Sequence, residues 1–113
     1  MSLLSVIRRL FVGERANPFG LPGVHYEGGD GSTRESAIIV RGAVSELEGI
    51  AATFGWMHEH LGAKDEEWRL VTHASGIDGD RKIDTFHVVL RRGETRHIYF
   101  DVSESFGKRF GPG

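Results

Sequence analysis

The chain has 113 residues, of which 39% are hydrophobic, and a formal net charge of −2 from 14 basic and 16 acidic side chains. This length and apolar content predict a single globular domain over residues 1–113, and the balanced charge argues against binding to nucleic acid or to an anionic membrane. The chain contains no cysteine, which excludes disulfides and thiolate chemistry and favours a reducing compartment, so we expect a cytoplasmic protein.

The N-terminal segment 1–11 is predicted to form a short amphipathic helix. Its apolar side would carry Leu3, Leu4, Ile7, Leu10 and Phe11. The segment is too short to span a membrane, and it does not have the order of a secretory signal because Arg8 and Arg9 follow the apolar residues. Residues 12–34 are rich in glycine and proline and are predicted to form an irregular connector.

An α+β core is predicted over residues 35–105. It begins with a strand at 36–41, which is rich in β-branched residues, and continues with one long helix at 43–61. At about 100° per residue, one side of this helix is an apolar stripe predicted to face the core: Leu47, Ile50, Ala51, Phe54, Met57 and Leu61.

Three further strands are predicted at 68–73, 83–90 and 96–102, because apolar and polar residues alternate there. One face would be apolar: Trp68, Leu70, Phe86, Val88, Leu90, Ile98, Phe100 and Val102. The other would carry Arg69, His73, Thr85, His87, His97, Tyr99 and Asp101. Three-residue loops ending in Gly79 and Gly93 would keep these faces separate, since they pair Leu70 with Phe86 and Phe86 with Ile98. Residues 106–113 are predicted to form a flexible tail.

The predicted fold is therefore a long helix packed on an antiparallel sheet, in the order β-α-β-β-β, after a short N-terminal helix. This order resembles the cystatin and monellin type of topology. Cystatins inhibit cysteine proteases through a Gln-x-Val-x-Gly loop that this sequence does not contain, so the resemblance does not imply inhibition. The Gly-Gly-Asp-Gly-Ser, Ala-Ile-Ile and Tyr-Phe-Asp-Val patterns also resemble a group of small bacterial proteins, and that resemblance implies no activity.

The polar face of the three strands is the first candidate site. Arg69, His87 and His97 are predicted to form one cross-strand row, with Tyr99 in the next, and they could bind a ligand. A metal site is not predicted, because it needs three or four converging ligands. The glycine-rich stretch 28–33 lacks the lysine and the following helix of a phosphate loop, so a tight turn is the favoured interpretation.

The second candidate is a surface on the long helix. Trp56 points away from the apolar stripe, beside Gly49, Ala52 and His60, and an exposed indole next to small residues indicates a docking surface. Its cover could be segment 1–11 of the same chain, a second subunit, or an N-terminal helix exchanged between subunits. The two histidines at 58 and 60 lack the i, i+4 spacing of a helical zinc motif.

No serine lies in a nucleophile elbow, and no catalytic residue or cofactor is predicted. The leading hypothesis is thus a non-catalytic protein–protein interaction module that self-associates as a homodimer. The alternative is a ligand-binding or hydrolytic domain that uses the face with His87, His97 and Tyr99.

Overall fold

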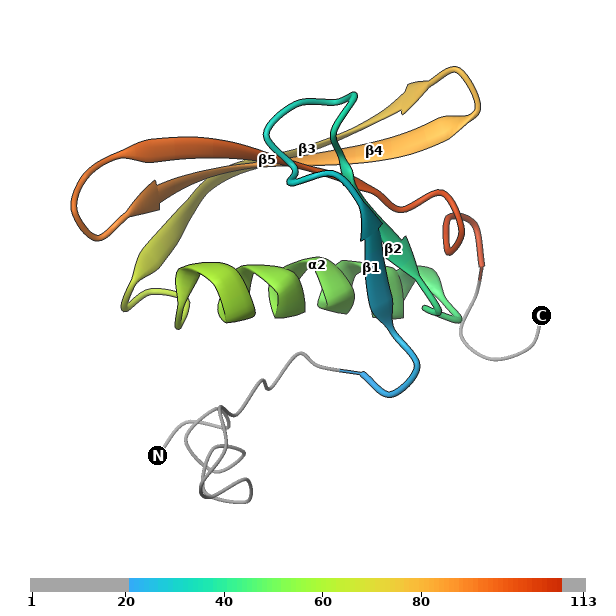
Figure 1. Ribbon diagram of the computed structural model, residues 1–113, viewed down its shortest axis with the longest axis horizontal. Coiled ribbons are helices and arrows are strands. Elements are labelled where there is room, and N and C mark those ends of the chain that lie inside the picture. The colour runs from blue at the N-terminus through green and yellow to red at the C-terminus, as the bar shows by residue number, and fades with distance from the viewer. Residues whose placement is uncertain (1–20, 109–113) are drawn as a thin grey trace.

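The computed structural model of the protein describes residues 21–108, in which one helix packs against a five-stranded sheet (Figure 1). The predicted α+β class is confirmed. The predicted N-terminal helix 1–11 lies outside the described residues, as does most of the predicted tail. The elements are β1 (His25–Gly28), β2 (Ile38–Arg41), α2 (Glu46–Leu61), β3 (Trp68–Asp78), β4 (Arg81–Leu90) and β5 (Thr95–Asp101).

The sheet is mixed, which corrects the prediction of an antiparallel sheet. Its strand order is β1-β2-β5-β4-β3, and β2 runs parallel to β5 while all other neighbours are antiparallel. Strands β2 and β3 therefore point the same way, and α2 is the crossover that parallel strands require. Strand β1 lies within the predicted irregular connector, where its short polar sequence gives no alternating pattern.

The β3–β4 hairpin differs from its predicted register. Asp78 pairs with Arg81, so the turn has two residues, and Gly79 occupies its first position with φ of 66°. The pairings next to this turn are moved by three residues relative to the predicted loop, since Phe86 pairs with His73 instead of Leu70. A β-bulge at Val71, between the Leu70 and Thr72 pairings, moves the register back by one. A shift of two residues remains, so Leu70 pairs with Val88 and the predicted pairing with Phe86 is wrong, but Trp68 and Leu70 keep the predicted apolar face.

The bulge has a second effect, because it reverses the faces of the residues that follow it. His73 pairs with Phe86 and Ser75 pairs with Asp84, which places both β3 side chains on the side of the sheet that faces α2. The prediction that His73 lies on the outer polar face is therefore wrong.

The β4–β5 hairpin confirms its predicted register. Phe86 pairs with Ile98, and Leu90 and Glu94 are joined across the turn by a backbone hydrogen bond of 2.7 Å. Gly93 takes the left-handed conformation with φ of 99°, as the predicted three-residue loop requires.

Helix α2 begins at the N-cap Ser45, whose hydroxyl accepts a hydrogen bond from the Glu48 amide at 3.2 Å. The predicted apolar stripe is confirmed along the second half of the helix, where Met57 is buried and Phe54 and Leu61 pack against the core, but not along the first half. The fully buried positions of the helix are mostly small residues, namely Gly49, Ala52, Thr53, Gly55 and Met57. Leu47 and Ile50, predicted to face the core, are 61% and 43% exposed.

Small residues on the buried side allow the helix to approach its neighbours closely. A Cβ atom at Gly49 would lie 2.3 Å from the Ser105 hydroxyl oxygen, and the Tyr26 hydroxyl donates a hydrogen bond of 2.7 Å to the Ala52 carbonyl. The sheet contributes the larger core side chains, including Ile38, Val40, Trp68, Phe86, Val88, Ile98 and Phe100.

Candidate functional site

The outer face of the sheet holds the four predicted ligand-binding residues. His87 and His97 pair directly across β4 and β5, and their rings stack with centroids 4.4 Å apart. Tyr99 lies in the next row, opposite Thr85, as predicted. Arg69 pairs with Val89 and so lies one row away from the histidines instead of beside them.

These residues do not converge on one point. The two imidazoles stack on each other, and Arg69 and Tyr99 lie in the rows on opposite sides of them. Between residues 21 and 108, no group of three or more His, Cys, Asp or Glu side chains is placed to hold a metal ion. The face therefore presents a paired-histidine surface and not an assembled ligand site.

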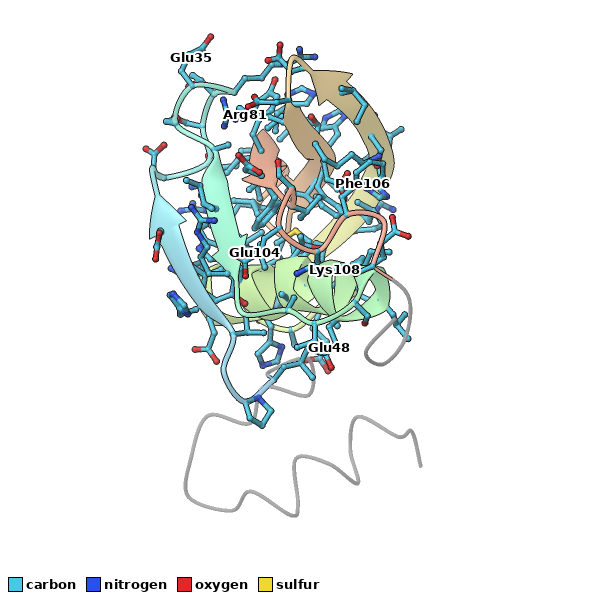
Figure 2. All side chains as sticks on the ribbon, turned by 90° about the vertical axis from the view of Figure 1, so that its right-hand side faces the viewer. Glu35, Glu48, Arg81, Glu104, Phe106 and Lys108 are labelled. Carbon is cyan, nitrogen blue, oxygen red and sulfur yellow. The ribbon has the colours of Figure 1, made fainter. Side chains whose placement is uncertain are left out.

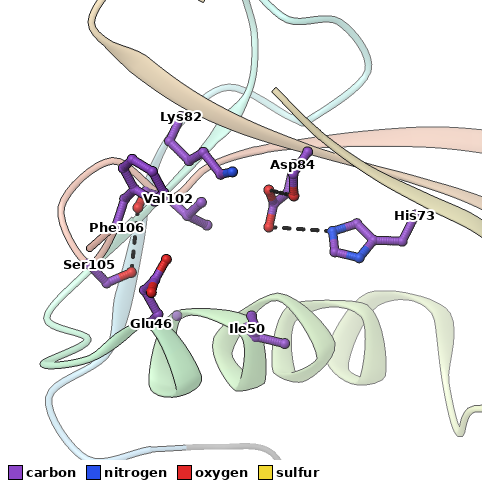
Figure 3. Close-up of a pocket in the computed structure, with 10 residues that line it drawn as sticks. Glu46, Ile50, His73, Lys82, Asp84, Val102, Ser105 and Phe106 are labelled. Atoms are coloured by element: carbon purple, nitrogen blue, oxygen red, sulfur yellow. Dashed lines mark hydrogen bonds and ion pairs between the residues drawn. The ribbon is translucent and has the colours of Figure 1, made fainter. Parts of the chain in front are cut away.

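A hollow of about 100 Å³ lies on the other side of the sheet, between α2 and the β3–β4 hairpin (Figure 3). The buried Asp84 carboxylate is its central polar group. Ser75 donates a hydrogen bond of 2.6 Å to Oδ1 of Asp84, and Nε2 of His73 lies 3.5 Å from Oδ2. The His73 ring also stacks on Phe86 with its centroid 4.3 Å away.

This Ser, Asp and His set is not a catalytic triad. In a triad, histidine lies between the other two, so that it can take the proton of the serine hydroxyl. Here the carboxylate lies between, since the Ser75 hydroxyl and the His73 ring both meet Asp84. The arrangement gives the buried Asp84 carboxylate its polar partners and links the side chains of β3 to β4. Sequence reasoning missed it because only the bulge at Val71 turns His73 and Ser75 inward.

The predicted docking surface around Trp56 is not a free surface. Gly49 and Ala52 are buried, and the Trp56 ring packs edge-on against Phe100 of β5 with centroids 5.6 Å apart. The His60 ring also stacks on the indole, with the two ring centroids 3.9 Å apart. The prediction that Gly49 and Ala52 belong to an outer surface is wrong, because they lie on the buried side of α2, whereas His60 is exposed.

Two other surfaces are open in the described part of the chain. The first, called the α2 patch, consists of Val44, Leu47, Ile50 and Phe106, which are 43–61% exposed. Figure 2 shows Lys108 beside α2 and Phe106 above it, toward the sheet. The Lys108 carbonyl accepts a hydrogen bond of 2.9 Å from the Glu46 amide there.

The second open surface, called the β3 edge, comprises residues 70–78. Strand β3 is an edge strand, at the opposite end of the sheet from β1. The backbone of its first residue is paired, because the Asp65 amide donates a hydrogen bond of 2.6 Å to the Trp68 carbonyl. Beyond Trp68, no strand within residues 21–108 pairs with this edge. Most of its side chains are exposed, Ile77 to 62%.

Ionic and polar contacts fix the loops around the sheet. The loop between β1 and β2 lies on the side away from α2 (Figure 1), where Asp30 accepts hydrogen bonds from the amide and hydroxyl of Ser32. This confirms the tight turn predicted for residues 28–33. Glu104 accepts a hydrogen bond from the Gly42 amide at 2.8 Å and pairs with Arg41, and together these lower the pKa of its carboxyl.

No protein-family model, curated protein or solved structure matches the chain. The resemblances to cystatin topology and to small bacterial proteins therefore stay predictions. Among the described residues, no helix is both long enough and apolar enough to cross a membrane.

Proposed function

We propose that this protein is a non-catalytic, cytoplasmic interaction module that forms a homodimer through its β3 edge. In the dimer, β3 pairs antiparallel with β3 of a second copy and the two sheets become continuous. The observation that carries the proposal is the length and composition of this edge. Strand β3 has 11 residues, and positions 72–77 contain no Lys, Arg, Asp, Glu or Pro.

Sheet edges offer unpaired backbone groups, and soluble proteins normally protect them with charges, prolines, bulges or short strands. The bulge at Val71 disfavours strand pairing at only one end of this edge. The one ionisable side chain between 72 and 77, His73, is turned inward against Phe86 and Asp84. The uncharged stretch is therefore suited to strand addition.

The charges at the two ends of the edge support pairing with a second copy. Arg69 lies at one end, whereas Asp78 and Asp80 lie at the other. Antiparallel pairing of two identical strands brings Arg69 of each copy near the aspartates of the other copy. Parallel pairing would instead place like charges together. The edge is thus self-complementary, which a two-fold symmetric interface requires.

The alternative, a ligand-binding or hydrolytic role for His87, His97 and Tyr99, has weaker support. Its residues are spread over two cross-strand rows, and the two imidazoles stack on each other. A nucleophile with an aligned base would be needed for hydrolysis, and the Asp84 cluster has the wrong order of contacts for that.

Light scattering after gel filtration tests the proposal. We expect the wild-type molar mass to rise toward that of a dimer as the protein concentration increases. Ala74→Lys places a charge on the exposed middle of the edge and should keep the protein monomeric. Thr95→Lys, an equal charge change on exposed β5, is the matched control and should leave the dimer intact. A wild-type monomer at all concentrations, or equal effects of the two variants, would reject the proposal.

A further inference from the structure

The apolar side chains of α2 are only partly covered by the other described residues. The predicted stripe of α2 is packed along its second half, where the Phe54 ring meets Phe86 and Trp68 with centroids 5.5 and 6.4 Å away. Along its first half, Leu47 and Ile50 remain 61% and 43% exposed. Phe106, from the segment after β5, joins Ile50 at the hollow beside the patch.

A cluster of large apolar side chains at the surface of a small protein indicates a contact site. We propose that segment 1–11 of the same chain covers the α2 patch. This inference is independent of the dimer proposed above, because the β3 edge is a different surface.

The path of the chain supports this occupant. The first described residues lie beside the start of α2, since a Cβ atom at Gly42 would come within 2.0 Å of the Gly23 carbonyl oxygen. Gly42 is two residues before Val44 of the patch. Residues 12–20 can bridge up to roughly 30 Å when extended at about 3.3–3.6 Å per residue, whereas the 16-residue helix α2 is only about 24 Å long at 1.5 Å per residue. Segment 1–11 can therefore reach the patch without strain.

The chemistry of the segment matches the patch. Leu3, Ile7 and Leu10 recur at helical spacing, which predicts one apolar side of about three turns. The segment contains Arg8 and Arg9 but no acidic residue. The patch is flanked by the acidic side chains Glu46 and Glu48 in the first turn of α2. Opposite charges favour this pairing on the side of Glu46 and Glu48, whereas Nζ of Lys82 lies 4.7 Å from the Phe106 ring centroid at the other part of the patch.

Engineered cysteine pairs test the inference cleanly, because the natural chain has no cysteine. The full-length Ile7→Cys, Leu47→Cys variant should form a disulfide within one chain on mild oxidation, seen as a monomer mass with no free thiol under denaturing conditions. Ile7→Cys with Thr95→Cys is the control, because Thr95 is also exposed but lies on β5. Its disulfide yield should be several-fold lower.

Two outcomes would overturn the inference. One is a yield for the Leu47 pair that does not exceed the control. The other is a disulfide found only between two chains and lost on dilution, which would show that a second copy supplies the segment. The same cysteine pair is then placed in the Ala74→Lys variant, in which pairing of the β3 edges is blocked. The intrachain disulfide should still form there, because contact between segment 1–11 and the α2 patch does not depend on the dimer. The charge contribution is checked with Arg8→Glu and Arg9→Glu together, which should lower the yield several-fold.

Discussion

Asp101, at the end of β5, connects three parts of the chain through its carboxylate. Oδ2 accepts a hydrogen bond from Nε of Arg81 at 3.0 Å, and Oδ1 accepts one from the Ser103 hydroxyl at 2.6 Å and one from the Ser103 amide at 3.0 Å. Partial burial acts to raise the pKa of Asp101, but the hydrogen bonds from Ser103 and the contact with Arg81 outweigh it and lower the pKa. The carboxylate form is thus the one that stabilises the fold.

Replacing Asp101 with alanine should lower the free energy of unfolding by about 1–3 kcal/mol at pH 7, because three donor groups lose a buried acceptor. The pKa of Asp101 is lower in the folded than in the unfolded chain, where it is about 3.9. Its stabilisation is therefore complete above about pH 4 and is lost as the pH falls through the folded-state pKa.

Urea unfolding at pH 7 and pH 3 measures this dependence. The wild type should lose more stability than Asp101→Ala over this interval, since the other carboxylates are common to both proteins. Equal losses in the two proteins would contradict the assigned role of Asp101.

At the scale of the elements, the sequence predicts what short-range patterns determine. Helix α2, β2, β4, β5 and the β4–β5 turn all follow from periodicity or from Gly93. The β3–β4 register does not, because a three-residue loop and a two-residue turn with a bulge both keep Trp68 and Leu70 on the apolar face. Nothing in the sequence around Val71 distinguishes these solutions, and the positions of His73 and Ser75 depend on which one forms.

The orientation of α2 could not be predicted for a different reason. Hydrophobic periodicity assigns the core to the side with the largest apolar side chains. The first half of the helix instead turns Gly49 and Ala52 inward, because close approach to Ser105 and Tyr26 is possible only over small residues. Such an approach depends on partners that are distant in sequence, as does the pairing of β1 with β2.

The orientation of α2 can be tested with two neighbouring alanines. Ala52→Leu should destabilise the protein by about 1–3 kcal/mol, because Ala52 is 1% exposed and a larger side chain must displace its surroundings. Ala51→Leu is the matched control at a half-buried position and should cost less. Thermal or urea unfolding checks both variants. A larger loss for Ala51→Leu would restore the predicted orientation, in which Ala51 faces the core.

At the scale of the whole molecule, the two edges of the sheet differ in their protection. Strand β1 has four residues and carries His25 and Glu27, which lie 3.2 Å apart, and Glu27 also pairs with Arg41. A short, charged edge discourages further strand pairing. The longer β3 edge has no such charges in its middle. This asymmetry predicts that only the β3 edges pair between copies. Assembly then ends at a dimer, because the β1 edge does not pair with another strand.

A charge exchange across the β3 edge tests the proposed dimer most directly, with sedimentation velocity over a concentration series as the measurement. Arg69→Glu and Asp78→Arg each place like charges at both ends of the paired strands, so each should weaken the dimer by about tenfold, equivalent to about 1.4 kcal/mol. The double variant restores opposite charges and should dimerise like the wild type. A double variant as weak as the two single changes combined would contradict antiparallel β3 pairing.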